Sequence, residues 1–320
     1  VLDSASVIFA NSDIDIEGEI QSFSSNPIEI FDSSTVLVSG APVLIGKQAE
    51  LLIDSNSTLL VQRGSLILKD TSKVLADNGT VFIDDGSILA FDWSTIEGTN
   101  SSTFAILSGN VSLSNNSTFK LTDKSTIDVE GNGGSTEGSI FLGGQTSLTV
   151  EDSTVSINGG VLSLIKNATA TATDNSKISI KGDFNLSDNT SFTALGGTEV
   201  SVLNKGSVIT KGTSDILIDG SSMLVDAGDV KLFDFATLSV LNVGSVKVVN
   251  DGNFFLFNSS SVSLDAGSSL NVEDGGDFSL NHFSSFSAKD YSSISVSGGG
   301  NLVLDGTIDG KLEDHVTLSV

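Results

Sequence analysis

The chain of 320 residues contains no cysteine, and it has one arginine, one tryptophan, one tyrosine and two prolines. Without cysteine there is no disulfide framework, no thiolate metal site and no cysteine nucleophile. The 15 basic side chains, with Arg63 as the one arginine, stand against 40 acidic ones, for a net charge of −25. Nucleic-acid binders need a surface of lysine and arginine, so this class is nearly excluded. An anionic membrane surface is disfavoured for the same reason.

Long apolar runs are also missing. No stretch of 18 apolar residues occurs, so we expect no transmembrane helix. The chain begins at Val1 without a signal peptide, and we therefore expect a mature chain or a piece of a larger one. Serine and threonine together contribute 79 residues and glycine 33, yet 38% of the residues are hydrophobic, enough to bury a sizeable core.

Most of the sequence is one repeated unit. A Ser/Gly/Asn-rich turn is followed by two apolar residues with one residue between them, and this period of 2 predicts a short strand with one buried face. Three such units make a longer repeat, since residues 236–256, 260–280 and 284–304 match in pattern at an offset of 24. Eight pairs follow one another near the C-terminus: Val246/Val248, Phe254/Leu256, Val262/Leu264, Leu270/Val272, Phe278/Leu280, Phe286/Ala288, Ile294/Val296 and Leu302/Leu304.

One glycine marks the same place in every longer repeat, mostly at steps of 22–24 residues. We expect it at a corner that needs a positive φ or close approach of the backbone. The 29-residue step between two of these glycines predicts a loop insertion at residues 131–137. The markers are Gly18, Gly40, Gly64, Gly86, Gly109, Gly138, Gly159, Gly182, Gly206, Gly228, Gly252, Gly276 and Gly300.

A single coil of three short strands cannot bury its apolar side, but stacked coils can. The sequence therefore predicts an all-β fold: one parallel β-solenoid domain over residues 1–320, with about 13 coils and three strands per coil. In this pattern the chain resembles right-handed parallel β-helices, namely the pectin-lyase-like superfamily and the passenger rods of bacterial surface adhesins. The resemblance implies either a polysaccharide hydrolase or lyase, or a rod at a cell surface.

The middle residue of each apolar–x–apolar unit is expected to face solvent. Between Val36 and Ala90 all of these middle residues are apolar, and we expect such a surface to be covered by a partner or by another copy. The predicted assembly surface consists of Leu37, Leu44, Leu52, Leu60, Ile67, Leu75, Phe82 and Leu89, together with Phe141, Leu162, Ile209, Phe255 and Val303. Repeat units also run to both termini, so the chain is expected either to continue a longer solenoid or to stack end to end.

Asn-x-Ser/Thr sequons are twice as frequent as the composition alone predicts. If the chain is secreted, they are candidates for glycosylation. The ten asparagines are Asn56, Asn78, Asn100, Asn110, Asn115, Asn116, Asn167, Asn185, Asn189 and Asn258.

Evidence for catalysis is weak. Glycoside hydrolysis needs two carboxylates about 5–10 Å apart, and the nearest candidates are Asp84, Asp85 and Asp92. The polysaccharidase motifs NTD and GHG are absent, and a chain with one arginine and a strong negative charge would repel a polyuronate. We therefore expect no enzymatic activity, with a polysaccharide hydrolase or lyase as the alternative.

No metal or cofactor is expected either. His282 and His315 are 33 residues apart, which is not a whole number of coils. Weak Ca²⁺ binding by corner acids is the open alternative, with Asp123, Asp219, Asp226 and Asp265 as donors.

The resulting hypothesis is an extracellular or cell-surface structural protein. It would form a filament, sheath or surface layer from copies of itself, through its outward apolar residues and open coil ends. Glycans or other surface proteins are further expected partners. Two alternatives are a carbohydrate-active β-helix enzyme and the passive stalk of an adhesin.

Overall fold

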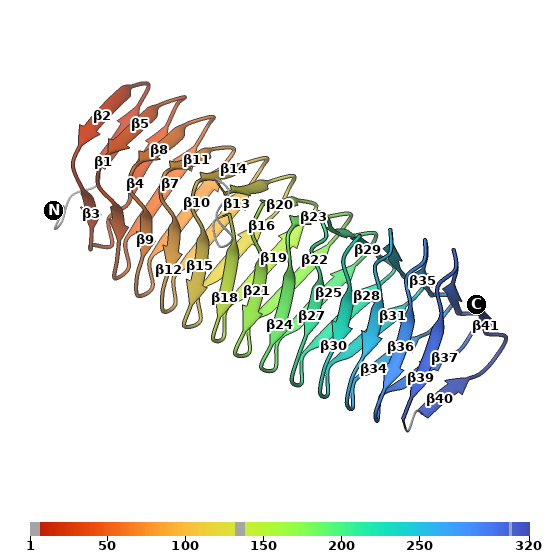
Figure 1. The fold of residues 1–320 in the computed structure, drawn as a ribbon. Helices are drawn as coiled ribbons and strands as arrows, with labels where there is room; N and C mark the ends of the chain where they lie inside the picture. The colour runs from red at the N-terminus through yellow and green to blue at the C-terminus, as the bar shows by residue number, and fades with distance from the viewer. Residues whose placement is uncertain (1–6, 132–137, 307–308) are drawn as a thin grey trace. The chain divides into compact units, whose positions relative to one another are not determined.

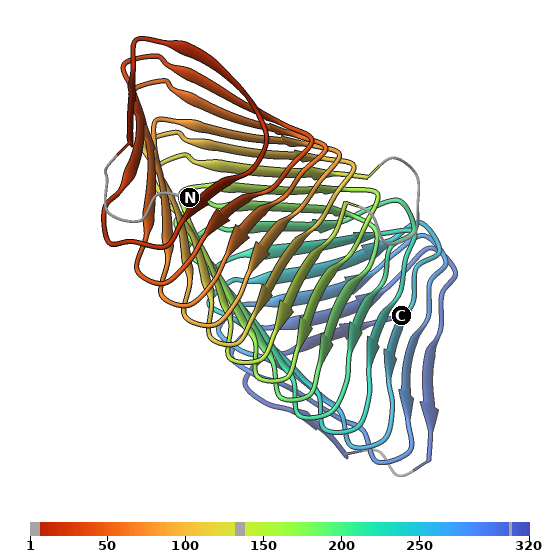
Figure 2. The same ribbon diagram turned by 90° about the vertical axis from the view of Figure 1, so that its left-hand side faces the viewer.

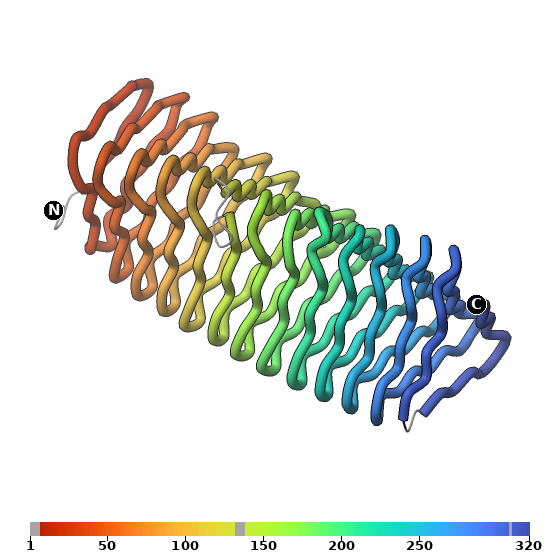
Figure 3. The backbone as a smooth tube through the Cα atoms, viewed as in Figure 1, coloured from red at the N-terminus to blue at the C-terminus, as the bar shows by residue number. Residues whose placement is uncertain are grey.

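The computed structural model describes residues 7–131, 138–306 and 309–320. Its described part consists of 41 β-strands and contains no helix. The fold is a parallel β-solenoid of about 13 coils with three strands per coil, which confirms the predicted fold class. The chain divides into two compact units, Val1–Gly160 (unit 1) and Val161–Val320 (unit 2), so a single domain over residues 1–320 stays a prediction. Figures 1 and 3 show the coils of unit 1 in red to yellow and those of unit 2 in green to blue.

Sheet B collects the first strand of each coil. In unit 1 its order is β1 (Val7–Ala10), β4 (Ile28–Phe31), β7 (Glu50–Asp54), β10 (Lys73–Asp77), β13 (Thr95–Thr99), β16 (Thr118–Leu121) and β19 (Ser147–Glu151). In unit 2 the order is β22 (Thr169–Thr173), β25 (Ser191–Leu195), β28 (Asp215–Asp219), β31 (Thr237–Leu241), β34 (Ser261–Leu264), β37 (Ser285–Ala288) and β40 (Asp309–Leu312).

Sheet C collects the second strand of each coil. In unit 1 its order is β2 (Asp13–Glu17), β5 (Thr35–Ser39), β8 (Thr58–Gln62), β11 (Thr80–Asp84), β14 (Thr103–Leu107), β17 (Thr126–Glu130) and β20 (Thr154–Asn158). In unit 2 the order is β23 (Lys177–Lys181), β26 (Glu199–Val202), β29 (Ser222–Asp226), β32 (Ser245–Val249), β35 (Ser269–Val272), β38 (Ser293–Val296) and β41 (Thr317–Ser319).

Sheet A collects the third strand, the one that follows the marker glycine. In unit 1 its order is β3 (Ile20–Ser22), β6 (Val43–Ile45), β9 (Leu66–Leu68), β12 (Ile88–Ala90), β15 (Val111–Ser114) and β18 (Ile140–Gly143). In unit 2 the order is β21 (Leu162–Ile165), β24 (Phe184–Ser187), β27 (Val208–Thr210), β30 (Val230–Leu232), β33 (Phe254–Leu256), β36 (Phe278–Asn281) and β39 (Leu302–Asp305).

Alternate residues of each strand point into the coil and form the core. The pair Val246 and Val248 is fully buried, as the period of 2 predicts. Strands of successive coils pair in parallel, so equivalent residues stack on one another, and Val246 lies beside Leu270 of the next coil. Figure 2 shows these strands running side by side within each unit. Phenylalanines fill the wider parts of the core, and Phe104 meets Phe119 edge to face at a centroid distance of 5.1 Å.

Most of the marker glycines stack on one another at the corner between sheets C and A, whereas Gly18, Gly40, Gly138 and Gly159 have a positive φ. A Cβ atom at Gly109 would overlap the carbonyl oxygen of Gly86, and one at Gly86 would overlap that of Gly64. In unit 2 the same relation joins Gly206, Gly228, Gly252, Gly276 and Gly300, each to the glycine one coil before it. The predicted role of these glycines in close backbone approach is therefore confirmed, because a larger residue would collide with the neighbouring coil.

A polar ladder runs beside the glycines, formed by the residue that follows each of them. The backbone N–H of Asn253 donates to Asp229 Oδ1 at 2.9 Å, and that of Asp277 donates to Asn253 Oδ1 at 2.9 Å. The N–H of Asn301 continues the series to Asp277 Oδ1 at 2.8 Å. Side-chain oxygens thus satisfy corner N–H groups that a turn would otherwise leave unpaired.

The predicted loop insertion at residues 131–137 lies outside the described residues except for Gly131. That residue donates its backbone N–H to the carbonyl of Asn158 at 3.1 Å.

Candidate functional site

The eight apolar middle residues between Val36 and Ala90 lie on the outer side of the three sheets, as predicted. All eight are half-buried, because each is flanked by its neighbours in the same sheet. They do not form one contiguous patch, since they belong to three sheets that make up different sides of each coil. The ladders are Leu37, Leu60 and Phe82 on sheet C, Leu44, Ile67 and Leu89 on sheet A, and Leu52 and Leu75 on sheet B.

Leu162 is the one predicted surface residue that the structure places in the core, where it is fully buried. The sequence offers two adjacent glycines at this corner. Gly160, not Gly159, stacks on the preceding coil, where its Cβ would lie 2.6 Å from the carbonyl oxygen of Gly138. The inward pair therefore begins one residue later than predicted, and Ser163 takes the outward place.

The other predicted surface residues of sheet A do face outward. Phe141, Ile209 and Phe255 are half-buried, and Val303 is exposed. Phe255 also packs on Phe257, with ring centroids 5.7 Å apart.

Phe257 belongs to a stack of aromatic rings where sheet A of unit 2 turns toward sheet B. Phe233 and Phe257 are parallel within 8° at 4.8 Å, and the Lys211 ammonium lies 5.6 Å from the Phe233 ring centre. These contacts use the ring faces, which a sugar would otherwise need for stacking. The ring faces of this stack are therefore already occupied by side chains of the protein.

The outer face of sheet C in unit 1 carries little charge along β5, β8, β11 and β14. On β5, β8, β11 and β14 its first column is threonine throughout: Thr35, Thr58, Thr80 and Thr103. The middle column is Leu37, Leu60, Phe82 and Ala105. Asp84 is the one charged side chain among the outward residues of these four strands.

The carboxylates proposed for catalysis do not come together. Asp84 and Asp85 lie at the corner between sheets C and A, before β12, while Asp92 lies at the far end of β12, at the corner between sheets A and B. The left-handed φ of 56° at Asp85 and 60° at Asp92 gives both residues a role in the turns. Asp92 is therefore separated from Asp84 and Asp85 by the whole of β12, and the three carboxylates do not share one site.

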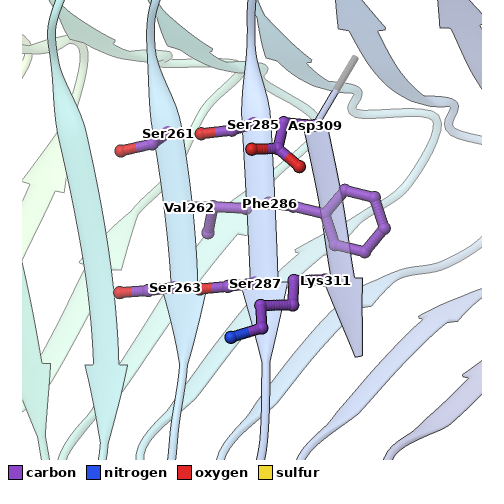
Figure 4. Close-up of a pocket in the computed structure, with 8 residues that line it drawn as sticks. All are labelled: Ser261, Val262, Ser263, Ser285, Phe286, Ser287, Asp309 and Lys311. Atoms are coloured by element: carbon purple, nitrogen blue, oxygen red, sulfur yellow. The ribbon is translucent and has the colours of Figure 1, made fainter. Parts of the chain in front are cut away.

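A shallow hollow of about 270 Å³ lies over the last strands of sheet B in unit 2. Figure 4 shows the lining of this hollow, in which two polar rows that follow the strand register flank Val262 and Phe286. One row is Ser261, Ser285 and Asp309, and the other is Ser263, Ser287 and Lys311. The Lys311 ammonium is paired with Glu313 at 2.9 Å, so the cation beside the hollow already has a counter-charge.

The described residues contain no group of three His, Cys, Asp or Glu side chains that could hold a metal ion. Asp219 and Asp226 accept hydrogen bonds from Asn242 and Asn250, both at 2.6 Å. Asp265 is paired with Lys289 at 2.9 Å, and Asp123 lies in an exposed turn with a φ of 55°. Asp123, Asp219 and Asp265 lie at the corner between sheets B and C but in non-adjacent coils, and Asp226 lies at the corner between sheets C and A.

The two histidines also belong to different corners. His282 lies in the turn after β36, which leads from sheet A to sheet B, and His315 lies in the turn after β40, which leads from sheet B to sheet C. The imidazole of His315 stacks on Tyr291 at 5.0 Å.

Corner geometry explains the excess of sequons. Eight of the ten asparagines have a positive φ, the left-handed conformation that asparagine tolerates better than most residues. Asn110 and Asn185 are the two without it. Seven are exposed: Asn56, Asn78, Asn100, Asn115, Asn167, Asn189 and Asn258. The side chains of these seven asparagines are accessible to a modifying enzyme. The high number of sequons in the sequence is explained by the preference of the corners for asparagine.

Three aromatic residues are exposed at the same position of the turns that follow sheet A strands: Trp93, Phe235 and Phe283. They are 65%, 64% and 70% exposed. Each is the third residue after the last inward residue of a sheet A strand, as in Leu232-Phe233-Asp234-Phe235. This fixed place in the repeat is the signal that could have identified them.

The described part of the chain has no helix long and apolar enough to cross a membrane. No family model, curated protein or solved structure matches this chain.

Proposed function

We propose that this protein is a structural and adhesive extracellular β-solenoid that assembles laterally with copies of itself. The observation that carries the proposal is the outer face of sheet C in unit 1. There the ladder of Leu37, Leu60 and Phe82 runs beside a column of threonines, with Asp84 as the one charge on four strands. An apolar, nearly uncharged face on an otherwise charged protein is a typical contact surface.

Charge determines where two copies can meet. With a net charge of −25, copies repel one another over most of their surface. Along β5, β8, β11 and β14 the sheet C face combines low charge with a regular array of side chains, so the electrostatic cost of approach is low there. The outer face of sheet B is less suited to such a contact, because its ladder of Leu52 and Leu75 is flanked by the charged residues Glu29 and Glu97.

The size of this face sets the strength of the contact. Four strands of five residues cover roughly 300 Å², against about 800 Å² per partner in a stable protein pair. We therefore expect weak pairwise association, which becomes significant when many contacts repeat along an assembly. End-to-end pairing of coils stays a separate prediction.

Two further observations support a non-catalytic role outside the cell. Asp92 lies at a different corner from Asp84 and Asp85, so the three candidate carboxylates do not gather at one site. Six sequon asparagines besides Asn258 are exposed at turns, where glycans would not disturb the core. The scaffold itself resists unfolding, because every coil adds backbone hydrogen bonds and buried side chains to its neighbours.

The test is concentration-dependent sizing combined with electron microscopy. We expect assemblies from the unaltered protein, and monomers from Leu60→Glu, which places a charge in the centre of the contact. Leu75→Glu is the matched control, since it makes the same change at the equivalent outward position of sheet B. If the unaltered protein stays monomeric up to high concentration, or if Leu75→Glu dissociates the assembly as well, the proposed contact is wrong.

A further inference from the structure

The turns that join sheet A to sheet B in unit 2 repeat one geometry. The register aligns Leu232, Leu256 and Leu280 before the turns. It aligns Thr237, Ser261 and Ser285 after them. Each turn therefore contains four residues, and its third position is occupied in successive coils by Phe235, Ser259 and Phe283.

The two phenylalanines project into solvent. Phe235 is 64% and Phe283 is 70% exposed, whereas the core phenylalanines, such as Phe254 and Phe278, are almost completely buried. The residue before each exposed ring has the same left-handed φ, 61° at Asp234 and 60° at His282. Two equivalent turns thus present two rings in the same way. Large exposed aromatic side chains indicate a binding role more often than small apolar ones do.

The spacing of the two rings is fixed by the coils. They are two coils apart, which corresponds to about 9.6 Å along the stack. The intervening position is Ser259, whose short exposed side chain leaves the space between the rings open. Neither ring is part of the Phe233–Phe257 stack, so their faces are not used within the described structure.

A polar column lies directly beside the rings, at the second position of the same turns. It consists of Asp234, Asn258 and His282, all exposed. Asn258 Nδ2 donates to Asp234 Oδ1 at 3.2 Å, and the backbone N–H of Gly212 donates to Asp234 Oδ2 at 3.4 Å. The second amide hydrogen of Asn258 is left to bond a ligand, and each oxygen of Asp234 keeps a further lone pair. The edge therefore offers two apolar rings and a row of hydrogen-bonding groups next to them.

We propose that this edge, centred on Phe235 and Phe283, binds a neutral, extended, β-linked polysaccharide. In such a chain successive sugars are turned over, so the same C–H-rich face recurs once per disaccharide. Two coils match the length of one extended disaccharide, so both rings would meet equivalent faces of the same glycan. The negative faces of the rings attract the polarised C–H groups, and Asp234, Asn258 and His282 bond the hydroxyls.

Charge selects against acidic glycans. The net charge of −25 and the carboxylate of Asp234 repel uronate and sulfate groups. The ligand is therefore an uncharged chain of the cellulose or chitin type. This inference rests on the adhesive part of the proposed function, because it names the kind of surface to which the solenoid would adhere. It does not depend on the self-assembly contact on sheet C.

The experiment measures retention of the full chain on insoluble cellulose and chitin, and retardation in gels containing soluble hydroxyethyl cellulose. We expect Phe235→Ala and Phe283→Ala each to weaken binding by about threefold to tenfold, and the double variant to abolish it. Val243→Ala is the matched control, since Val243 is 77% exposed in a different corner of unit 2. It should bind as the unaltered protein does.

A second variant tests the spacing of the rings. Ser259→Phe combined with Phe283→Ser keeps two exposed rings but brings them to adjacent coils, about 4.8 Å apart. We expect this exchange to abolish retention, although the aromatic content is unchanged. Circular dichroism should show the same fold for every variant, because all the altered side chains are exposed.

Three results would overturn the proposal. The unaltered protein could fail to bind any of these neutral glycans, the exchange variant could bind normally, or Val243→Ala could weaken binding as much as Phe235→Ala. Leu60→Glu separates this inference from the assembly contact, because it should bind glycan and yet remain monomeric. Assembly without glycan retention would contradict the glycan site alone.

Discussion

The ring of Phe104 occupies the space that a side chain at Gly98 would fill. A Cβ atom at Gly98 would lie 2.8 Å from Cε2 of Phe104, and 2.7 Å from the hydroxyl oxygen of Ser102. Gly98 holds an inward position of β13, where its neighbours in the sheet are Ala76 and Leu121. The glycine is therefore part of the core packing, since it admits a large ring from the adjacent strand β14.

Gly98→Ala should destabilise the protein. Alanine loses less backbone entropy on folding than glycine does, but the overlap of its Cβ with the core outweighs that gain. Overpacking of a closed core costs about 1–3 kcal/mol, which we expect as a decrease in the free energy of unfolding measured with urea. Phe104→Leu in the same chain should recover part of that loss, because leucine has no atom in the place of Cε2. Additive effects of the two substitutions would contradict the proposed contact.

Gly109→Ala should be more damaging, because the obstacle is backbone. The new Cβ would overlap the carbonyl oxygen of Gly86, which is fixed in the neighbouring coil. We expect a loss of more than about 3 kcal/mol in the free energy of unfolding. Gly310→Ala is the comparison, because there the new Cβ meets the ring edge of Phe286, which can rotate away. Equal losses for the two variants would show that backbone stacking at this corner is not the cause.

The repeat pattern of the sequence was sufficient to predict the solenoid, its three strands per coil and most of the inward pairs. This succeeded because alternation along a strand and stacking between coils both leave a regular apolar signal. It failed at Gly159-Gly160, where two residues fit the pattern equally well. Only the packing of Gly160 against Gly138 decides between them, and with it the burial of Leu162.

The surface was harder to predict than the core. The pattern placed the apolar middle residues between Val36 and Ala90 on all three faces of the coil, but it did not show whether the three ladders join into one contiguous surface. The exposure of Phe235 and Phe283 depends on the shape of a four-residue turn. Sequence composition alone does not reveal that shape, because the left-handed position is occupied by Asp234 in one turn and His282 in the other.

Thr210 suggests a substitution that should stabilise the protein. Its side chain is fully buried between Leu186 and Leu232 of sheet A, and its hydroxyl has no hydrogen-bond partner. Thr210→Val keeps the shape and removes the unpaired hydroxyl, so we expect a gain of about 1–2 kcal/mol in the free energy of unfolding. Thermal and urea unfolding would measure it.

Thr190→Val is the matched control for that prediction. Thr190 is also buried, but its hydroxyl lies 3.1 Å from the hydroxyl of Ser214. Removing this group deletes one buried hydrogen bond, although Ser214 Oγ still accepts the backbone N–H of Thr190 at 3.2 Å, so the variant should lose about 1 kcal/mol. If both substitutions change stability in the same direction, the satisfaction of the hydroxyl is not what distinguishes the two sites.

Asp229 should make stability depend on pH in acid. Burial raises the pKa of its carboxyl group, but hydrogen bonds from Lys231 and Asn253 outweigh burial and hold the pKa below the ordinary value of 3.8. A carboxylate with a depressed pKa in the folded state stabilises the protein above the unfolded-state pKa. That contribution is lost as the pH falls through the folded-state pKa.

Asp229→Asn isolates this effect. The asparagine oxygen can still accept the N–H groups of Asn253, so mainly the ion pair with Lys231, 2.7 Å in length, is lost. We expect the variant to be less stable at pH 7 by about 1 kcal/mol or less, because the pair is partly exposed. The difference from the unaltered protein should shrink below about pH 4 and vanish below the folded-state pKa. A difference in the free energy of unfolding that stays constant from pH 7 to pH 2 would show that Asp229 acts through packing and not through its charge.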